Sequence, residues 1–329
     1  MVVQRLPVVT GWIPLVGSFC DDSNPGFQHT ARTRSHFMEA YALITAVHNE
    51  ERHIEKTLRS VTSQTVLPAK WIIVSDGSTD RTDELVERYA KSFQFIRLVR
   101  REREQQRNFA SKVFAQNAGL QMLAPNHIDF VGLSDGDISF GPGYFHCLLE
   151  KFSKDPRLGL AGGFVYEEVN GRFIPVAGNR TRSVAGAIQV FRRECFESIG
   201  GLLPLKYGCV DTYPEIAARM RGWRVQSFPE LEIRHHRPTG GAAGYRYRQG
   251  FADYSIGYHP VFEVARLLRQ IPCRPFSLGA VAQLCGFVAA NFCREKRMVS
   301  PDLVAFLRNE QKERLLPFGR RRTKGQSRV

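Results

Sequence analysis

Apolar runs that alternate with helical segments in the first half of the chain limit its fold more than any other feature. The runs cover residues 41–47, 71–74, 95–99 and 130–133. Between them, apolar residues recur at helical spacing, as at Ile54, Leu58 and Val61. Strands that alternate with helices join through right-handed crossovers into a mostly parallel sheet, with ligands beyond the carboxyl ends of the strands. The sequence therefore predicts an α/β fold with its binding site at that edge.

Acidic loops follow two of these runs. Asp135-Gly136-Asp137 comes directly after residues 130–133, and a second acidic loop, residues 76–80, follows an earlier run. Carboxylates at the end of a buried strand are hard oxygen ligands of the kind that Mg²⁺ and Mn²⁺ prefer, and such a cation usually completes its shell with substrate phosphates. Either loop alone would also suit an ordinary turn or a helix cap. Together they predict a nucleotide-diphosphate and metal site.

The loop after the first run is polar as well. It begins with His48 and Asn49, and we expect Asn49 to cap a helix whose first turn holds Glu50 and Glu51. A further helix is predicted over residues 108–123.

The second half of the chain has a different pattern, which predicts a mixed sheet. Strands are predicted at residues 158–165, 187–191, 225–228 and 231–233. Asn170-Gly171 is a strong hairpin signal, and Pro214 suits the first turn of a helix. We expect these later strands to form the acceptor side of the site.

The charge of the chain is uneven. Its formal net charge is +14, yet residues 246–329 alone hold 16 Lys and Arg against 6 Asp and Glu. The earlier sequence is nearly balanced, as expected of an enzyme core rather than of a nucleic-acid scaffold. The seven cysteines are scattered, odd in number and without a C-x-x-C pair, which favours a reducing compartment over a disulfide framework or a zinc site.

The chain divides into three parts. We expect residues 1–38 to be a leader, either disordered or the product of a start codon assigned too early, and residues 39–240 to form the catalytic domain. Residues 241–329 form a basic helical region. Its apolar run, residues 276–292, has basic residues on both sides, which suits a helix lying in a membrane interface; a core helix or a dimer helix is the alternative.

Four motifs in this order resemble the family 2 inverting glycosyltransferases with the GT-A fold. They are His48-Asn49-Glu50-Glu51, Asp76-Gly77-Ser78-Thr79-Asp80, Asp135-Gly136-Asp137 and Asp211. The resemblance covers residues 40–239 and implies a GT-A-like, Rossmann-like, mostly parallel or mixed sheet flanked by helices, with a C-terminal helical extension. The segment 254–269, with the apolar helix and basic segment after it, is similar to the tails of bacterial members that act at membranes.

The resemblance also implies roles for individual residues. The metal, Mg²⁺ or Mn²⁺, would be held by Asp135, Asp137, His235 and His236. The donor would contact Val47, Asn49, Glu50, Asp76, Ser78, Arg107, Asp135 and Gly136. The cation is needed because the departing diphosphate gains charge in the transition state. A surface pair of histidines and a solvated helix start at Arg107 are the structural alternatives.

Asp211 is the candidate general base. Inverting transfer is a single in-line displacement, so one carboxylate must accept the proton of the acceptor hydroxyl. Similar enzymes usually show two adjacent acids here, whereas this chain has Val210 in the first position. Glu215 is the fallback, and a helix-terminal acid without catalytic part is the structural alternative for Asp211.

We therefore predict a sugar transferase. The donor would be a UDP-, GDP- or dTDP-linked sugar, and the acceptor a saccharide or lipid-linked saccharide in polysaccharide or glycolipid synthesis, in the cytoplasm or at the cytoplasmic face of a membrane. A nucleotidyltransferase is the enzymatic alternative, although Glu50 and Glu51 would repel a triphosphate. A non-enzymatic, basic protein that binds nucleic acid or membrane is the other alternative. We expect no nucleic-acid partner, because the basic excess lies in the tail without an aromatic-basic motif.

Overall fold

The computed structural model describes residues 40–315 except for four internal segments, 103–109, 124–127, 238–242 and 270–275. The predicted leader, the basic residues from 320 onward and the donor contact predicted for Arg107 lie outside the described residues.

The first half of the sheet is parallel, as predicted. Its elements are β1 (Tyr41–Val47), α1 (Ile54–Thr62), β2 (Lys70–Asp76), α2 (Thr82–Ser92), β3 (Ile96–Arg101), α3 (Ala110–Gln121) and β4 (Phe130–Asp135). The strands are ordered β3-β2-β1-β4, and each neighbouring pair is parallel. Their carboxyl ends therefore lie at one edge, where both acidic loops begin.

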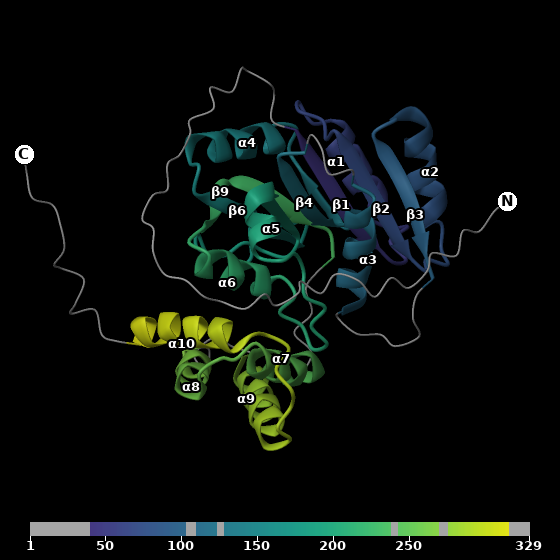
Figure 1. The fold of residues 1–329 in the computed structure, drawn as a ribbon. Coiled ribbons are helices and arrows are strands. Elements are labelled where there is room, and N and C mark those ends of the chain that lie inside the picture. The colour runs from purple at the N-terminus through teal and green to yellow at the C-terminus, as the bar shows by residue number, and fades with distance from the viewer. Residues whose placement is uncertain (1–39, 103–109, 124–127, 238–242, 270–275, 316–329) are drawn as a thin grey trace, which may run out of the picture. The chain divides into compact units, whose positions relative to one another are not determined.

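The second half turns the sheet into a mixed one, again as predicted. Its elements are β5 (Ile138–Phe140), α4 (Tyr144–Lys154), β6 (Leu158–Val169), β7 (Arg172–Pro175), β8 (Ile188–Arg192), α5 (Arg193–Ser198), α6 (Thr212–Met220) and β9 (Arg224–His235). β8 is antiparallel to β4 and β6, whereas β9 is parallel to β6 and antiparallel to β5. The described strands form a single nine-stranded sheet (Figure 1).

The prediction of two short strands near residue 230 is wrong. β9 is one strand, and its register against β6 shifts where Phe228 pairs with Gly163 and Glu232 with Phe164. A Cβ on Gly163 would lie 2.0 Å from the carbonyl oxygen of Leu231, so the bulge depends on a residue without a side chain. The run of apolar residues in β9 is interrupted at this bulge, and the sequence pattern therefore resembles two short strands.

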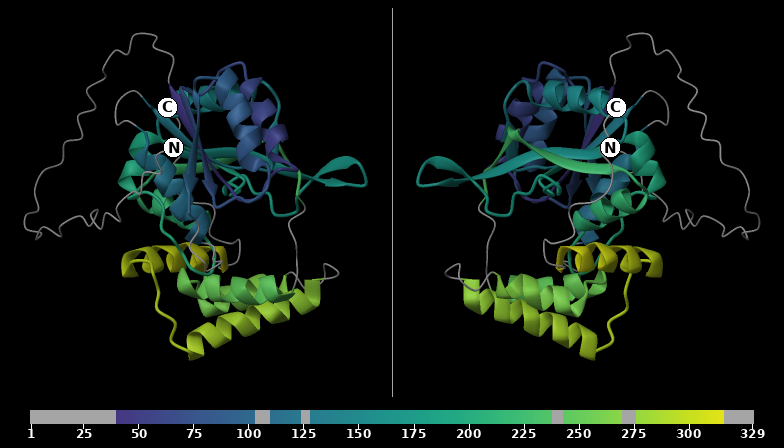
Figure 2. Two further views of the ribbon diagram at one scale, coloured as in Figure 1. Left: turned by 90° about the vertical axis from the view of Figure 1, so that its right-hand side faces the viewer. Right: turned by 90° about the vertical axis from the view of Figure 1, so that its left-hand side faces the viewer.

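The β6–β7 hairpin forms where the Asn-Gly pair predicted it. Asn170 and Gly171 have φ angles of 52° and 75°, the left-handed conformation that a tight hairpin turn requires. Figure 2 shows this hairpin, in teal, projecting beyond its neighbours.

Each face of the sheet is covered by helices, because alternate residues of the central strands point to opposite sides. Tyr41 and Leu43 pack with α1, α2 and α4 on one face. Ile44 packs on the other face with α3, α5 and α6 and with residues of the C-terminal helices, including Ala252 and Leu303. The strands are buried on both faces, which accounts for their continuous apolar runs.

Four helices follow the sheet. They are α7 (Ala243–Ser255), α8 (Pro260–Leu268), α9 (Phe276–Phe292) and α10 (Pro301–Leu315). Cβ atoms on Gly250 of α7 and Gly286 of α9 would lie 2.1 Å and 1.9 Å from backbone atoms of the other helix, so these two glycines let the helices touch. Among the residues that the structure describes, none of the helices combines the length and the apolar content needed to cross a bilayer.

Candidate metal and donor site

The acidic triplet occupies the turn between β4 and β5. Asp135 is the last residue of β4, and its backbone N–H donates to the carbonyl of Ala187 (2.9 Å), which fixes the strand end. A Cβ on Gly136 would lie 2.6 Å from Cγ1 of Val47, so only glycine fits between the two aspartates. Val47 thus shapes the turn, and its contact with the donor stays a prediction.

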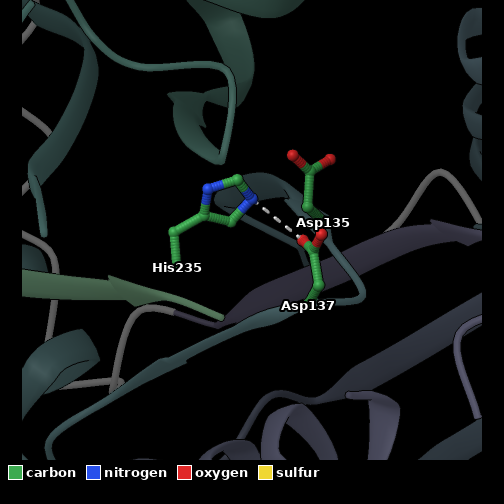
Figure 3. A group of neighbouring side chains, drawn as sticks. All are labelled: Asp135, Asp137 and His235. Carbon is green, nitrogen blue, oxygen red and sulfur yellow. Dashed lines mark ion pairs between the residues drawn. The ribbon is translucent and has the colours of Figure 1, made fainter. Parts of the chain in front are cut away.

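The third member of the cluster comes from the last strand. β9 pairs with β5 so that His235 lies opposite Ile138, the residue after Asp137. The ligand atoms of Asp135, Asp137 and His235 all lie within 4.8 Å of one another, and His235 Nε2 is 3.3 Å from Asp137 Oδ1 (Figure 3). Two carboxylates and one imidazole form a donor set that could hold a divalent cation.

His236 does not join this cluster, contrary to the predicted ligand set. Successive residues of a strand point to opposite faces, so only one of the two histidines can face Asp137. The Nε2 atom of His236 is hydrogen-bonded to Ser139 Oγ (2.8 Å), and its Nδ1 lies 3.4 Å from the ammonium nitrogen of Lys56. Burial, together with Lys56, lowers the pKa of His236 to about 4.

Asp137 and His235 each stabilise the charged form of the other. Burial works against both charges, but the hydrogen bond and the opposite charge between them lower the pKa of Asp137 and raise the pKa of His235. His235 Nδ1 also faces Glu167, whose Oε1 is 3.8 Å away. Asp137 is therefore an anion and a good cation ligand, and His235 would lose its proton when it binds a metal, because only the neutral imidazole is a ligand.

Lys112 is a site residue that the sequence analysis missed. It extends from α3, forms an ion pair with Asp135 and donates to the carbonyl of Gly186 (3.2 Å). Burial works against its charge, yet Asp135 and, more weakly, Asp211 and Asp137 raise its pKa, so it stays cationic. A single lysine within a helical pattern gives no local signal of such a role.

Arg237 was missed as well. It is the second residue after β9 and forms ion pairs with Glu50 and with Asp137, whose Oδ2 lies 3.4 Å from the Nε atom. Burial and Asp137 raise the pKa of Glu50 to about 7, and Arg237 opposes that rise. A basic residue after His235 and His236 was the available signal, but its place depends on the β5–β9 pairing.

Asn49 links the loops after β1 and β2 and does not cap a helix. Its side-chain oxygen accepts from the backbone N–H of Thr79 (2.8 Å), and its own N–H donates to Ser78 Oγ (3.2 Å). The prediction that Asn49 caps the next helix is wrong, because α1 begins at Ile54 and is preceded by His53. Asn49 has φ 54°, a left-handed conformation that asparagine tolerates.

Asp76 is the last residue of β2, and hydrogen bonds from two other residues fix its position. Arg101 at the end of β3 donates to its Oδ1 (2.7 Å), and the Nδ1 atom of His48 is hydrogen-bonded to its carbonyl oxygen (2.9 Å). A pocket of about 830 Å³ opens beside these loops. It is lined by His48, Asn49, Glu51, Arg52, His53, Asp80 and Arg237. Of the donor residues predicted in the two loops, Asn49 lines this pocket, whereas Glu50, Asp76 and Ser78 are not among its lining residues.

Asp211 and Glu215 differ in what holds them. Asp211 precedes α6 and accepts from the N–H of Thr212 (3.0 Å), and its Oδ2 lies 2.8 Å from where Gly186 would carry a Cβ. Glu215 is 5% exposed and accepts from the N–H of Val184 (2.7 Å). The carboxylate of Glu215 thus anchors an internal loop. Gly186, by contrast, lies between the side chains of Asp211 and Lys112.

The mixed sheet, the helices on both faces and the acidic turn at the carboxyl edge together define a glycosyltransferase of the GT-A fold. Residues 42–213 match the family described as "Glycosyl transferase family 2", and the chain belongs to that family. The resemblance stated from the motifs is therefore confirmed, and the protein is a glycosyltransferase.

Relatives of known sequence match a shorter segment. Poly-beta-1,6-N-acetyl-D-glucosamine synthase of Staphylococcus aureus is 29% identical over 126 residues, which is 38% of this chain and 28% of that protein. The uncharacterized glycosyltransferase EpsJ of Bacillus subtilis is 30% identical over 131 residues, 40% of this chain and 35% of its own length. The chain thus matches about a third of each relative.

Solved structures resemble a larger part of the chain. A mannosyltransferase from Pyrobaculum calidifontis, solved with GDP-Man and Mn²⁺, superposes with a TM-score of 0.54 and 18% identity over 86% of this chain and 82% of its own. GalNAc-T7, solved with UDP, GalNAc and Mn²⁺, has a TM-score of 0.54 and 13% identity over 77% of this chain and 55% of its own. At these identities the likeness is one of fold.

Proposed function

We propose that the protein transfers a sugar from a nucleotide-diphosphate donor to an acceptor hydroxyl, with inversion at the anomeric carbon and with Mg²⁺ or Mn²⁺. The observation that carries this proposal is the gathering of Asp135, Asp137 and His235 at the carboxyl edge of the sheet. The Mn²⁺ and nucleotide bound to the two similar solved structures support the same ligand class here.

The residues of the site then have distinct tasks. Asp137 and His235 would hold the cation, which supplies positive charge for the departing diphosphate. Asp135, oriented by Lys112, would complete the shell or hold the ribose. Asp76, Asn49, Glu50 and Ser78 would surround the nucleoside. Residues 39–140 would thus form the donor half of the catalytic domain.

Asp211 would act as the general base. One carboxylate must accept the proton of the attacking hydroxyl on the side opposite the leaving group. Asp211 is half-buried at the start of α6, whereas Glu215 is engaged inside the protein. Residues 141–240, which contain Asp211, would form the acceptor half.

The acceptor would be a saccharide or a lipid-linked saccharide, as in polysaccharide or glycolipid synthesis. The segment shared with the poly-N-acetylglucosamine synthase supports this choice. The five described cysteines are all free thiols, which supports a reducing compartment such as the cytoplasm. A lipid-linked acceptor would be met at the cytoplasmic face of a membrane.

The proposal is tested by thermal shift with UDP, GDP and dTDP, each with and without Mn²⁺, followed by transfer from the matching sugar nucleotide. We expect one diphosphate to raise the melting temperature only with metal, and Asp137→Asn to abolish that rise. Asp211→Asn should bind normally but lose turnover by a factor of about 100 or more. Metal-independent binding, or full turnover by both variants, would refute the proposal.

A further inference from the structure

Helix α9 is apolar on all sides, although only one side is covered among the described residues. Its buried side contains Ala280, Gln283, Phe287 and Ala290, and it packs on α7. The rings of Phe287 and Tyr254 lie 5.8 Å apart, and Gln283 Nε2 donates to the buried carboxylate of Asp253 (2.7 Å). A helix of this composition normally has apolar surroundings on every side.

The opposite side of α9 is exposed and equally apolar. Leu278, Val281, Val288 and Phe292 are 79%, 59%, 56% and 88% exposed. The neighbouring helix α8, which contacts α9, adds three more exposed residues. These are Val261, Val264 and Leu268. We call these seven residues the apolar face; on each helix they recur at intervals of three, four or seven, which places them along one side of that helix.

Basic residues follow the apolar face at the end of both helices. Arg269 comes directly after Leu268, and Arg294, Lys296 and Arg297 come after Phe292. All four are exposed, and Arg297 also lies over the ring of Tyr254 (5.1 Å). Glu295 is the one acidic residue in this second group. Positive charge beside exposed apolar side chains complements a surface that is both apolar and anionic.

We propose that the apolar face binds the surface of a lipid bilayer that contains anionic lipids, with α8 and α9 lying in the plane of the interface. The seven side chains would enter the boundary of the acyl region, and the basic residues would contact headgroup phosphates. The inference rests on the proposed function in one respect only: a lipid-linked acceptor would be met at the surface where the enzyme binds. Binding itself requires no catalysis.

The test is flotation of the purified full-length protein with vesicles, without any sugar nucleotide. We expect binding to phosphatidylcholine vesicles that contain 30% phosphatidylglycerol, a composition typical of an anionic surface, and weaker binding to pure phosphatidylcholine. Val288→Ser with Phe292→Ser should weaken binding about tenfold or more, because two large apolar side chains no longer enter the bilayer. The double substitution Arg294→Gln and Lys296→Gln should make vesicle binding depend less on anionic lipid and on salt.

Matched controls come from the same chain. Leu67 and Ile174 are exposed hydrophobic residues outside the apolar face, 44% and 47% exposed, and serine at either position should leave binding unchanged. Unchanged melting temperatures and unchanged metal-dependent nucleotide binding would show that the variants are folded. Absence of wild-type flotation, or equal losses in the controls, would overturn the inference, and so would a dimer that the Val288 and Phe292 substitutions dissociate. None of these outcomes bears on nucleotide binding or sugar transfer.

Discussion

At the scale of single residues, the acidic site depends on cations supplied by the protein. Asp135 is paired with Lys112, and Asp137 with His235 and Arg237. Without such partners, carboxylates so close together and partly buried would repel one another and favour protonation. Lys112 and Arg237 therefore orient the acidic ligands and favour their charged forms, although burial still raises the pKa of Asp135 above its usual value.

Replacing Lys112 should weaken donor binding more than it weakens the fold. In Lys112→Met, Asp135 loses its counter-ion, and we expect the donor dissociation constant to rise about tenfold, equivalent to one charge-assisted hydrogen bond of ~1.5 kcal/mol. Titration calorimetry with the nucleoside diphosphate and Mn²⁺ measures this change. Lys151→Met is the matched control, because Lys151 also pairs with an acid, Glu230 (2.7 Å), but lies outside the site. Equal affinities of the two variants would contradict the role of Lys112.

At the scale of elements, the buried carboxylate of Glu215 connects α6 to the loop before β8. Glu215 of α6 accepts from the N–H of Val184 and from the hydroxyl of Ser183. Burial raises its pKa from 4.5 to about 7, although those hydrogen bonds and Arg219 oppose the rise. Below pH 4.5 the carboxyl is protonated in both the folded and the unfolded state. As the pH rises from 4.5 towards 7, Glu215 ionises first in the unfolded state, which favours unfolding. The contribution of Glu215 to the free energy of unfolding is therefore lost.

Glu215→Gln should therefore gain stability relative to the wild type as the pH rises. A pKa difference of this size corresponds to about 3 kcal/mol of unfolding free energy between pH 4.5 and pH 8. Urea denaturation of both proteins at pH 4.5, 6 and 8 measures the difference. The exposed substitution Glu194→Gln serves as the control. A difference that stays constant with pH would show that Glu215 does not titrate in this range.

Sequence patterns predicted the elements whose signals are local. The buried strands, the Asn170-Gly171 turn and the acidic triplet after β4 each follow from neighbouring residues, and the structure contains them all. Lys112 and Arg237 could not be assigned, because their positions depend on how α3 crosses the sheet and how β9 pairs with β5. The same pairing decides which of the two histidines faces the carboxylates.

At the scale of the whole molecule, the C-terminal helices belong to the same core as the sheet. Leu303, Val304 and Leu307 of α10 are buried with Ile216 of α6 in one apolar cluster. Arg219 of α6 also donates to both carboxylate oxygens of Glu310 in α10, at 2.9 Å and 3.2 Å. We therefore expect sheet and helices to unfold in one cooperative transition.

A double-mutant cycle on this pair checks that expectation. Both side chains are about 20% exposed, so we expect Arg219→Gln and Glu310→Gln to show a coupling of about 1 kcal/mol in unfolding free energy. The pair Arg81 and Glu84, at 67% and 60% exposure, should show almost none. Separate unfolding transitions for the two parts, or a coupling no larger than that of the exposed pair, would count against a shared core.

The origin of His235 on β9 has a consequence for synthesis of the chain on the ribosome. β9 is the last described strand, about a hundred residues after the aspartates that its histidine joins. A nascent chain that has not yet added this strand carries both carboxylates but lacks the imidazole, so it cannot form the full cation site. Under the proposed function, capture of the metal would be deferred until the sheet is complete, and an unfinished polypeptide would not consume activated sugar.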